Sequence, residues 1–195
     1  MTPASATTTM LTSAPNPSIY GRAVTFTAVV SGVTGTPADG EAVTFMNVKT
    51  VLGTGALSGG SASFTISTLK LGTTAVTALY GGDVLFASST SNAVTQVVSK
   101  AATTTSLSSS QNPSNYGQAV TFTAVVTSAV GAPADGETVS FMQGATVLGT
   151  GTLSGGSAGF TTSALAAGSQ DIKAKYSGDA SFVGSMSNEV KQVVQ

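Results

Sequence analysis

The sequence contains no cysteine, no histidine and no tryptophan. Without cysteine, the fold cannot depend on disulfide bonds. Without histidine or cysteine, the chain cannot build the usual catalytic triads, thiol nucleophiles or zinc sites. A pair of carboxylates could still hydrolyse a glycoside, but that chemistry needs a substrate cleft, which a small domain with a filled core does not offer. We therefore predict that the protein is not an enzyme and has no cofactor.

Charge is also scarce. Only 8% of the 195 residues are charged, and 7 Lys and Arg against 8 Asp and Glu give a net charge of −1. Nucleic-acid binding needs clustered Lys and Arg, and an anionic membrane attracts a basic face, so we expect neither partner. No apolar run approaches the roughly 20 residues of a membrane-spanning helix, and we expect no membrane insertion.

No signal peptide opens the chain, because the first residues have neither a basic start nor an apolar run. We expect either that an export signal was removed or that the chain is a piece of a longer protein.

What the sequence does contain is an internal repeat. Asn16-Pro17-Ser18 returns as Asn112-Pro113-Ser114, a spacing of 96 residues, and Ala38-Asp39-Gly40-Glu41 returns at the same spacing as Ala134-Asp135-Gly136-Glu137. The register holds from Thr7 to Val98 without an insertion or deletion, and about six positions in ten are identical. The chain therefore carries two copies of one unit.

Each copy has the size of one small domain. We predict a first domain at residues 1–98, with a short N-terminal leader at 1–6, and a second domain at 103–195. Residues 99–102 form the predicted linker, which is too short for a flexible tether, so we expect limited hinge freedom.

Alternation of apolar and polar residues predicts strands in both copies. In the first copy Val24, Phe26, Ala28 and Val30 share one parity. In the second, the charged residues Asp171, Lys173 and Lys175 separate Ile172, Ala174 and Tyr176, so the apolar set should face the core. Turn-forming sequences such as Ser-Gly-Gly-Ser and Gly-Asp separate the runs, and no segment shows a helical period. About seven short strands per copy predict an all-β fold of two Greek-key sandwiches, without the Cys–Trp–Cys core of antibody domains.

An ordered set of motifs resembles the bacterial Ig-like repeat domains. In the first copy these motifs are Thr7–Leu11, Asn16–Gly21, Ala23–Val30, Val43–Met46, Leu52–Gly60, Tyr80–Phe86 and Ser89–Val94, and each has a counterpart in the second copy. The resemblance covers both copies nearly end to end. It implies tandem immunoglobulin-like sandwiches of about seven strands each, used as repeat units in large secreted or surface-anchored bacterial proteins. It brings no catalytic motif, and a fold alone does not fix function.

The acidic residues shared by the copies are the candidate binding groups. Asp39 and Glu41 correspond to Asp135 and Glu137, and two acids on one loop plus backbone carbonyls form a minimal calcium set. The alternative is turn chemistry, because Asp before Gly caps local N–H groups and Gly supplies positive φ. A dedicated calcium site needs more oxygens than this, so we favour the turn and assign no metal.

The aromatic and basic residues follow opposite rules. All 8 Phe and 4 Tyr have an aromatic counterpart in the other copy, and we assign most of them to the core. We expect Tyr20 and Tyr116 to be partly exposed, and Tyr80 and Tyr176 to bury their rings and bond their hydroxyls to nearby backbone. No Lys or Arg has a basic counterpart, so a function shared by both copies cannot depend on one. An internal Lys–Asn crosslink is disfavoured, because Lys173 and Lys175 should point outward.

Three functions are compatible with these features. The leading hypothesis is a non-catalytic structural spacer or stalk segment of an extracellular or cell-surface bacterial protein, with neighbouring Ig-like repeats of the same parent protein as its partners. One alternative is an adhesion module that binds a protein or glycan through loops at one end of a sandwich. Another is a subunit that assembles into a filament or virion decoration by pairing exposed edge strands.

Overall fold

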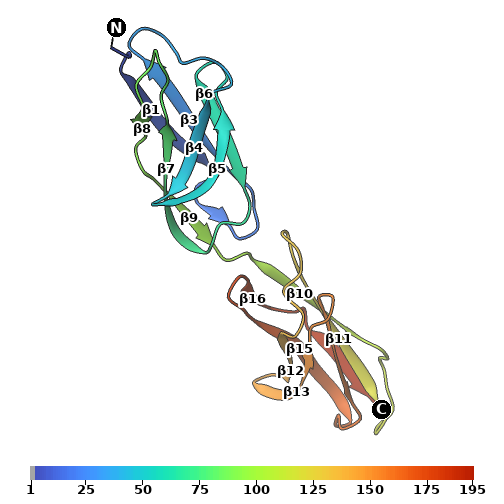
Figure 1. Ribbon diagram of the computed structural model, residues 1–195. Coiled ribbons are helices and arrows are strands. Elements are labelled where there is room, and N and C mark those ends of the chain that lie inside the picture. The colour runs from blue at the N-terminus through green and yellow to red at the C-terminus, as the bar shows by residue number, and fades with distance from the viewer. Residues whose placement is uncertain (1–2) are drawn as a thin grey trace. The chain divides into compact units, whose positions relative to one another are not determined.

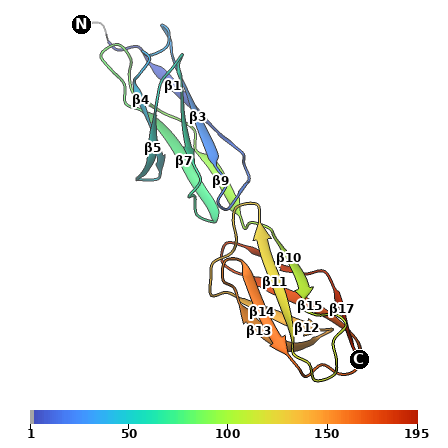
Figure 2. The ribbon, with the colours of Figure 1, turned by 90° about the vertical axis from the view of Figure 1, so that its right-hand side faces the viewer.

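The computed structural model describes residues 3–195, and none of these residues is helical (Figure 1). Contacts divide the chain into two compact units, the first ending at Ser99 and the second spanning Lys100–Gln195. Within residues 3–195 there is no helix long and apolar enough to cross a membrane. Each unit has its own hydrophobic core. In both views the strands of a unit run along its length (Figure 2).

The first unit has nine strands in its described residues. They are β1 (Thr7–Ala14), β2 (Ser18–Ile19), β3 (Val24–Gly32), β4 (Ala42–Asn47), β5 (Thr50–Ala56), β6 (Ser61–Ile66), β7 (Gly72–Tyr80), β8 (Ser89–Thr90) and β9 (Val94–Ser99). A three-stranded sheet has the order β1-β3-β6. A larger sheet has the order β2-β9-β7-β4-β5, with β8 paired to β7. Two of the nine strands, β2 and β8, are two-residue segments, so the longer strands match the predicted seven.

The second unit repeats this plan with eight strands. They are β10 (Thr103–Ser109), β11 (Val120–Ser128), β12 (Thr138–Gln143), β13 (Thr146–Thr152), β14 (Ser157–Thr162), β15 (Gly168–Gly178), β16 (Val183–Met186) and β17 (Val190–Val194). The sheets are β10-β11-β14 and β13-β12-β15-β16, with β17 paired to β15.

The predicted alternation is confirmed in the core. The four β3 residues Val24, Phe26, Ala28 and Val30 are all buried, as are Ile172, Ala174 and Tyr176 of β15. Across the sandwich Phe45 stacks on Phe64 with ring centroids 5.7 Å apart, an arrangement worth about 0.5–1.5 kcal/mol beyond burial. Gly53 makes room for this ring, because a Cβ there would lie 2.1 Å from a Phe64 ring carbon.

Both long sides of the first sandwich are closed. On one side β5 runs close to β6, because a Cβ on Gly55 would lie 2.5 Å from the Ser63 carbonyl oxygen. On the other side the Thr7 and Thr9 hydroxyls lie 2.7 Å from the Ser89 hydroxyl, joining β1 to β8 across the two sheets. The second unit has the same close approach of Gly151 to Gly159 and the same hydroxyl bonds from Thr103 and Thr105 to Ser185.

The segment between β1 and β2 moves the chain from one sheet to the other. Pro15 and Pro17 have no N–H to offer a ladder, and the pairing of β1 with β3 stops at Ala14. The chain then crosses over, and β2 pairs in parallel with β9, Ser18 opposite Val98. The Asn16-Pro17-Ser18 sequence thus carries the crossing between the two sheets.

Backbone hydrogen bonds anchor the residues of the predicted linker. Ser99 is the last residue of β9, and its carbonyl accepts a bond from the Tyr20 N–H (2.8 Å). Ala101 is fully buried in the second unit, where its N–H donates to the Ser181 carbonyl (3.0 Å) and its carbonyl accepts from the Val183 N–H (2.8 Å). One residue, Lys100, therefore lies between an anchor of the first unit and an anchor of the second.

Candidate functional site

The shared acidic residues gather at one end of each sandwich, which we call the loop end. It contains the connections from β3 to β4 and from β7 to β8, and their counterparts in the second unit (Figure 1). Asp39 Oδ1 accepts a hydrogen bond from the Gly59 N–H at 2.7 Å, and Asp135 Oδ1 accepts one from the Gly155 N–H at the same distance. Asp39 and Asp135 therefore each join two loops through one carboxylate.

Glu41 lies beside a buried tyrosine. The Tyr80 hydroxyl donates a hydrogen bond to Glu41 Oε2, so the prediction of a backbone partner for this hydroxyl was wrong. Burial raises the pKa of the Tyr80 phenol well above its usual range, and the bond to Glu41 and its negative charge raise it further. In the second unit, burial and the charge of Asp179 raise the pKa of Tyr176 in the same direction. Burial thus keeps both phenols protonated, and Tyr80 donates its proton in the hydrogen bond to Glu41.

Asp83 holds the connection from β7 to β8. Its Oδ1 accepts hydrogen bonds from the backbone N–H groups of Leu85 (2.7 Å) and Phe86 (2.5 Å). The bond from Phe86 is the main cause that holds the pKa of Asp83 below its ordinary value. Asp179 makes the same pair of bonds at 2.7 Å to Ser181 and Phe182. Asp83 and Asp179 thus cap N–H groups of their own loops, as turn chemistry expects of an aspartate. Asp39 and Asp135 instead accept from an N–H in another loop, so the local capping predicted for them was wrong.

The described carboxylates at the loop ends do not come together as a set of metal ligands. Nowhere in residues 3–195 do three or more acidic side chains come close enough together to hold an ion, whereas calcium takes about 6–8 oxygen ligands. The calcium alternative at Asp39, Glu41, Asp135 and Glu137 stays a prediction.

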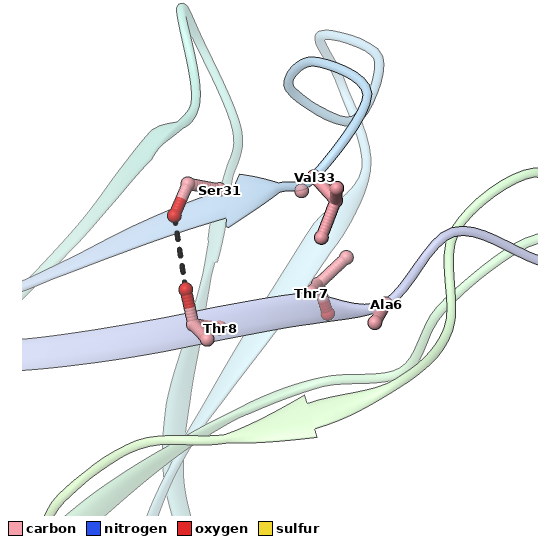
Figure 3. Close-up of a pocket in the computed structure, with 6 residues that line it drawn as sticks. Ala6, Thr7, Thr8, Ser31 and Val33 are labelled. Carbon is pink, nitrogen blue, oxygen red and sulfur yellow. Dashed lines mark hydrogen bonds between the residues drawn. The ribbon is translucent and has the colours of Figure 1, made fainter.

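A shallow pocket lies at the start of β1, beside the end of β3. It measures about 200 Å³ and is lined by Ala6, Thr7, Thr8, Ser31, Gly32 and Val33. Figure 3 shows Thr8 and Ser31 turned toward each other, with their hydroxyl oxygens 3.0 Å apart. Small-molecule sites usually enclose about 300–1,000 Å³ and carry convergent polar groups. This pocket is smaller, and the hydroxyls of Thr8 and Ser31 already bond to each other.

The loop end of the first unit also exposes large apolar side chains. Val33, Val84 and Leu85 are 85%, 89% and 66% exposed, beside an open groove of about 680 Å³ that includes Pro3 and Phe86. The corresponding residues of the second unit are Ala129, Ala180 and Ser181. The two loop ends therefore share their acidic residues and differ in apolar surface.

Sequence reasoning missed a set of amides at the opposite end of each sandwich. Gln96 and Gln192 are fully buried, although the pattern analysis assigned no role to either. Asn92 lies nearer the middle of β1, where its Oδ1 accepts from the Leu11 N–H (3.0 Å) and its Nδ2 donates to the Leu11 carbonyl (3.3 Å). The repeat could have pointed to these amides, because each of them recurs at the repeat spacing.

Two sheets of mainly antiparallel strands packed face to face, with the chain crossing from one to the other after its first long strand, define an immunoglobulin-like sandwich. The sequence matches the family described as bacterial Ig-like domain (group 3) over residues 11–99 and again over 107–195. The chain belongs to this family and is a tandem pair of bacterial Ig-like domains.

Several solved structures are similar to the chain. The fibronectin(III)-like modules of Clostridium thermocellum CbhA align with 16% identity and a TM-score of 0.39, covering 95% of each chain. The D0-D1 domain of intimin aligns with 21% identity and a TM-score of 0.36, covering 96% of this chain and 97% of that one. The Escherichia coli adhesin FdeC aligns with 17% identity and a TM-score of 0.38, covering 96% and 64%. A search of curated protein sequences finds no match.

Proposed function

We propose that the chain is a non-catalytic spacer segment of an extracellular or cell-surface bacterial protein, with neighbouring Ig-like domains of the same parent protein as its partners. The observation that carries this proposal is the pair of backbone anchors around Lys100. Ser99 is bonded to Tyr20 of the first unit, and Ala101 to Ser181 and Val183 of the second. Lys100 itself donates a side-chain hydrogen bond to the Asp179 carbonyl of the second unit (2.6 Å). Since each peptide bond is planar, a single residue between two backbone anchors leaves few rotatable backbone bonds between the units. A flexible tether needs many more.

The outward surface of the sandwiches supports a passive role. On the three-stranded sheet the Thr25 and Thr65 hydroxyls lie 2.9 Å apart, and those of Thr27 and Ser63 lie 3.3 Å apart. Hydroxyls that bond to each other across strands have less capacity left for a ligand. With few charges on the chain, such a surface stays polar without creating a strong electrostatic field.

A distance measurement tests the spacer. Because the chain has no cysteine, Lys70→Cys and Lys175→Cys give one label on each unit, both at exposed positions. We expect a narrow distribution of label distances in the natural chain, and a broad one after eight Gly and Ser residues are inserted beside Lys100. The same insertion into the exposed turn at Gly144 is the control and should leave the distribution narrow. An equally broad distribution in the natural chain would reject the spacer.

A second candidate function is adhesion through the loop end of the first unit. The exposed Val33, Val84 and Leu85 favour it, because large apolar residues gathered at one place often mark an interaction site. The matched variant replaces them with the residues of the second unit, as V33A, V84A and L85S. Saturable binding to a protein or glycan array that this variant loses would establish adhesion, and no binding by the natural chain would reject it.

Filament growth by strand pairing has less support. An exposed edge strand is what such assembly needs, and close approaches such as that of Gly55 to Ser63 bring the outer strand β5 against β6. A mass that stays monomeric at rising concentration in analytical ultracentrifugation would rule out this assembly, and fibres in negative-stain micrographs would establish it.

A further inference from the structure

Two amide side chains, the exposed Asn16 and the buried Gln96, lie where β2 pairs with β9. Asn16 Nδ2 donates to the Thr95 carbonyl (2.8 Å), and Asn16 Oδ1 accepts from the Val97 N–H (3.1 Å). One side chain thus pairs with two β9 residues as a neighbouring strand would. The Asn16 side chain thus adds one more pair of hydrogen bonds to the pairing of β2 with β9.

Gln96 makes the reciprocal connection from β9. Its Nε2 lies 3.0 Å from the Pro15 carbonyl oxygen and 3.2 Å from the Ser18 hydroxyl. The Ser18 hydroxyl in turn donates to the Val97 carbonyl (3.3 Å). Because Gln96 is fully buried, breaking these bonds without admitting water would leave polar groups unpaired, at a substantial cost. We call Asn16, Ser18 and Gln96 the amide latch of the first unit.

The second unit has the same latch, formed by Asn112, Ser114 and Gln192. Asn112 Nδ2 donates to the Lys191 carbonyl (2.7 Å), and Asn112 Oδ1 accepts from the Val193 N–H (2.9 Å). Gln192 Nε2 lies 2.9 Å from the Gln111 carbonyl oxygen, as Gln96 Nε2 lies near Pro15. Gln192 Oε1 also accepts from the Ser109 hydroxyl (2.6 Å), a bond that Gln96 Oε1 does not make in the first unit. Around the latch the sequence varies, since Pro15 becomes Gln111 and Thr95 becomes Lys191. The latch residues themselves are identical in the two units.

The position of the latch determines how a unit responds to a stretching force applied at its two ends. A pull on the chain enters the first unit through β1 and leaves it after Ser99, the end of β9. β2 follows β1 and is parallel to β9, so the pull slides the two strands past each other along their own axes. Inter-strand hydrogen bonds lie across that direction, and they must fail together instead of one after another.

We propose that the amide latch makes the β2–β9 pair the load-bearing element of each unit when the chain is stretched from end to end. A pull reaches β1 and its pairing with β3 first, and the latch adds side-chain bonds to the β2–β9 pairing through which the load then passes to the other sheet. It also ties the crossing segment before β2 to β9 in the first unit, through Pro15 and Asn16. This inference concerns the mechanics of each unit and does not depend on what the chain carries or binds.

Single-molecule stretching of the full chain at constant force tests the latch. The natural chain should unfold in two steps, each lengthening it by roughly 300 Å, because about 90 residues extend by ~3.3–3.6 Å each. Asn16→Ala should raise the unfolding rate of one unit on the order of tenfold, since it removes two hydrogen bonds from the loaded strands. Asn112→Ala should do the same for the other unit, and the double variant should accelerate both steps. Ser18→Ala is a milder variant for use if Asn16→Ala does not fold.

Two controls separate load bearing from a general loss of stability. Asp39→Ala removes the bond to the Gly59 N–H from loops outside the loaded pair, and should change the end-to-end unfolding rate much less than Asn16→Ala at a matched loss of equilibrium stability in urea. Handles at Lys49→Cys and Lys70→Cys pull on residues 49–70 alone, which include neither β2 nor β9. Asn16→Ala should accelerate unfolding less in that direction. Equal acceleration in both directions, or none from end to end, would overturn the proposal.

Discussion

The two units agree inside and differ outside. Phe26 and Phe122 are both fully buried at corresponding positions, whereas the outer face of the larger sheet has changed its chemistry. β15 carries Asp171, Lys173 and Lys175 where β7 carries Ala75, Thr77 and Leu79. The same core residues and buried glutamines are therefore compatible with a charged outer face, as on β15, or an uncharged one, as on β7. The interior specifies this sandwich, and the outer face can vary independently of it.

A second difference lies at the tip of the hairpin between β4 and β5. Val48 has a φ of +53°, and the corresponding residue of the second unit is Gly144, with a φ of +57°. A β-branched residue is rarely found in this left-handed region, and holding it there costs about 1–3 kcal/mol. The first unit therefore carries strain that the second unit avoids.

The largest predicted effect tests whether the two cores are equivalent. Phe26→Ala and Phe122→Ala should each lower the free energy of unfolding of their own unit by about 3–5 kcal/mol, because each leaves a cavity in a packed core. Urea denaturation of the full chain should show one transition moved and the other unchanged, with similar shifts for the two variants. A much smaller loss in one unit would break the equivalence.

The next effect concerns the buried tyrosines at alkaline pH. Since the folded state raises the pKa of Tyr80 and Tyr176, the unfolded chain releases these protons first, near pH 10. Stability from the neutral phenols is therefore complete below about pH 10 and falls as the pH rises further. Thermal melts from pH 8 to 11 should show a steeper fall in Tm for the natural chain than for the double variant Tyr80→Phe and Tyr176→Phe. Parallel curves would contradict the assignment.

The strained hairpin predicts a gain of stability from a substitution. Val48→Asn should stabilise the first unit by about 1 kcal/mol, because Asn tolerates the left-handed conformation without the extra backbone freedom of Gly. The reverse change, Gly144→Val, should destabilise the second unit by a similar amount. Differential scanning calorimetry of the two variants measures both, and an unchanged Tm in each would mean that the hairpin relaxes.

The smallest predicted effect concerns the charged face. The Lys173 ammonium lies 3.3 Å from Glu189, and that of Lys191 lies 3.5 Å from Asp171, with all four side chains about half exposed. Such exposed pairs contribute about 0–1 kcal/mol and are screened by salt. Glu189→Gln should therefore change the stability of the second unit by less than about 1 kcal/mol, and 1 M NaCl should remove the difference. Persistence of the difference at high salt would contradict a screened surface pair.

The sequence was sufficient to predict the sandwich because strands repeat every two residues. The inward set on β3 follows from that period alone. The partner of the Tyr80 hydroxyl did not, since Glu41 is distant in the sequence and no local pattern joins them. Gln96 was overlooked because a polar residue is expected to face water, although it has the same parity as Val94 and Val98. Which apolar residues remain uncovered at the loop end depends on how loops fold over them, and alternation carries no information about that.

The amide latch has a consequence for the synthesis of the chain. Val97, whose N–H donates to Asn16, lies 81 residues after Asn16 but only about 15 residues before Asn112, the counterpart of Asn16 in the next unit. Closing a short loop costs less entropy than closing a long one, so in an unfolded chain the incorrect partner is the nearer one, and an exchanged pairing between units becomes accessible. A ribosome delivers Val97 before Asn112, and the first unit can close on its own asparagine before a competitor exists. The order of translation thus favours the correct pairing between two units of nearly identical sequence.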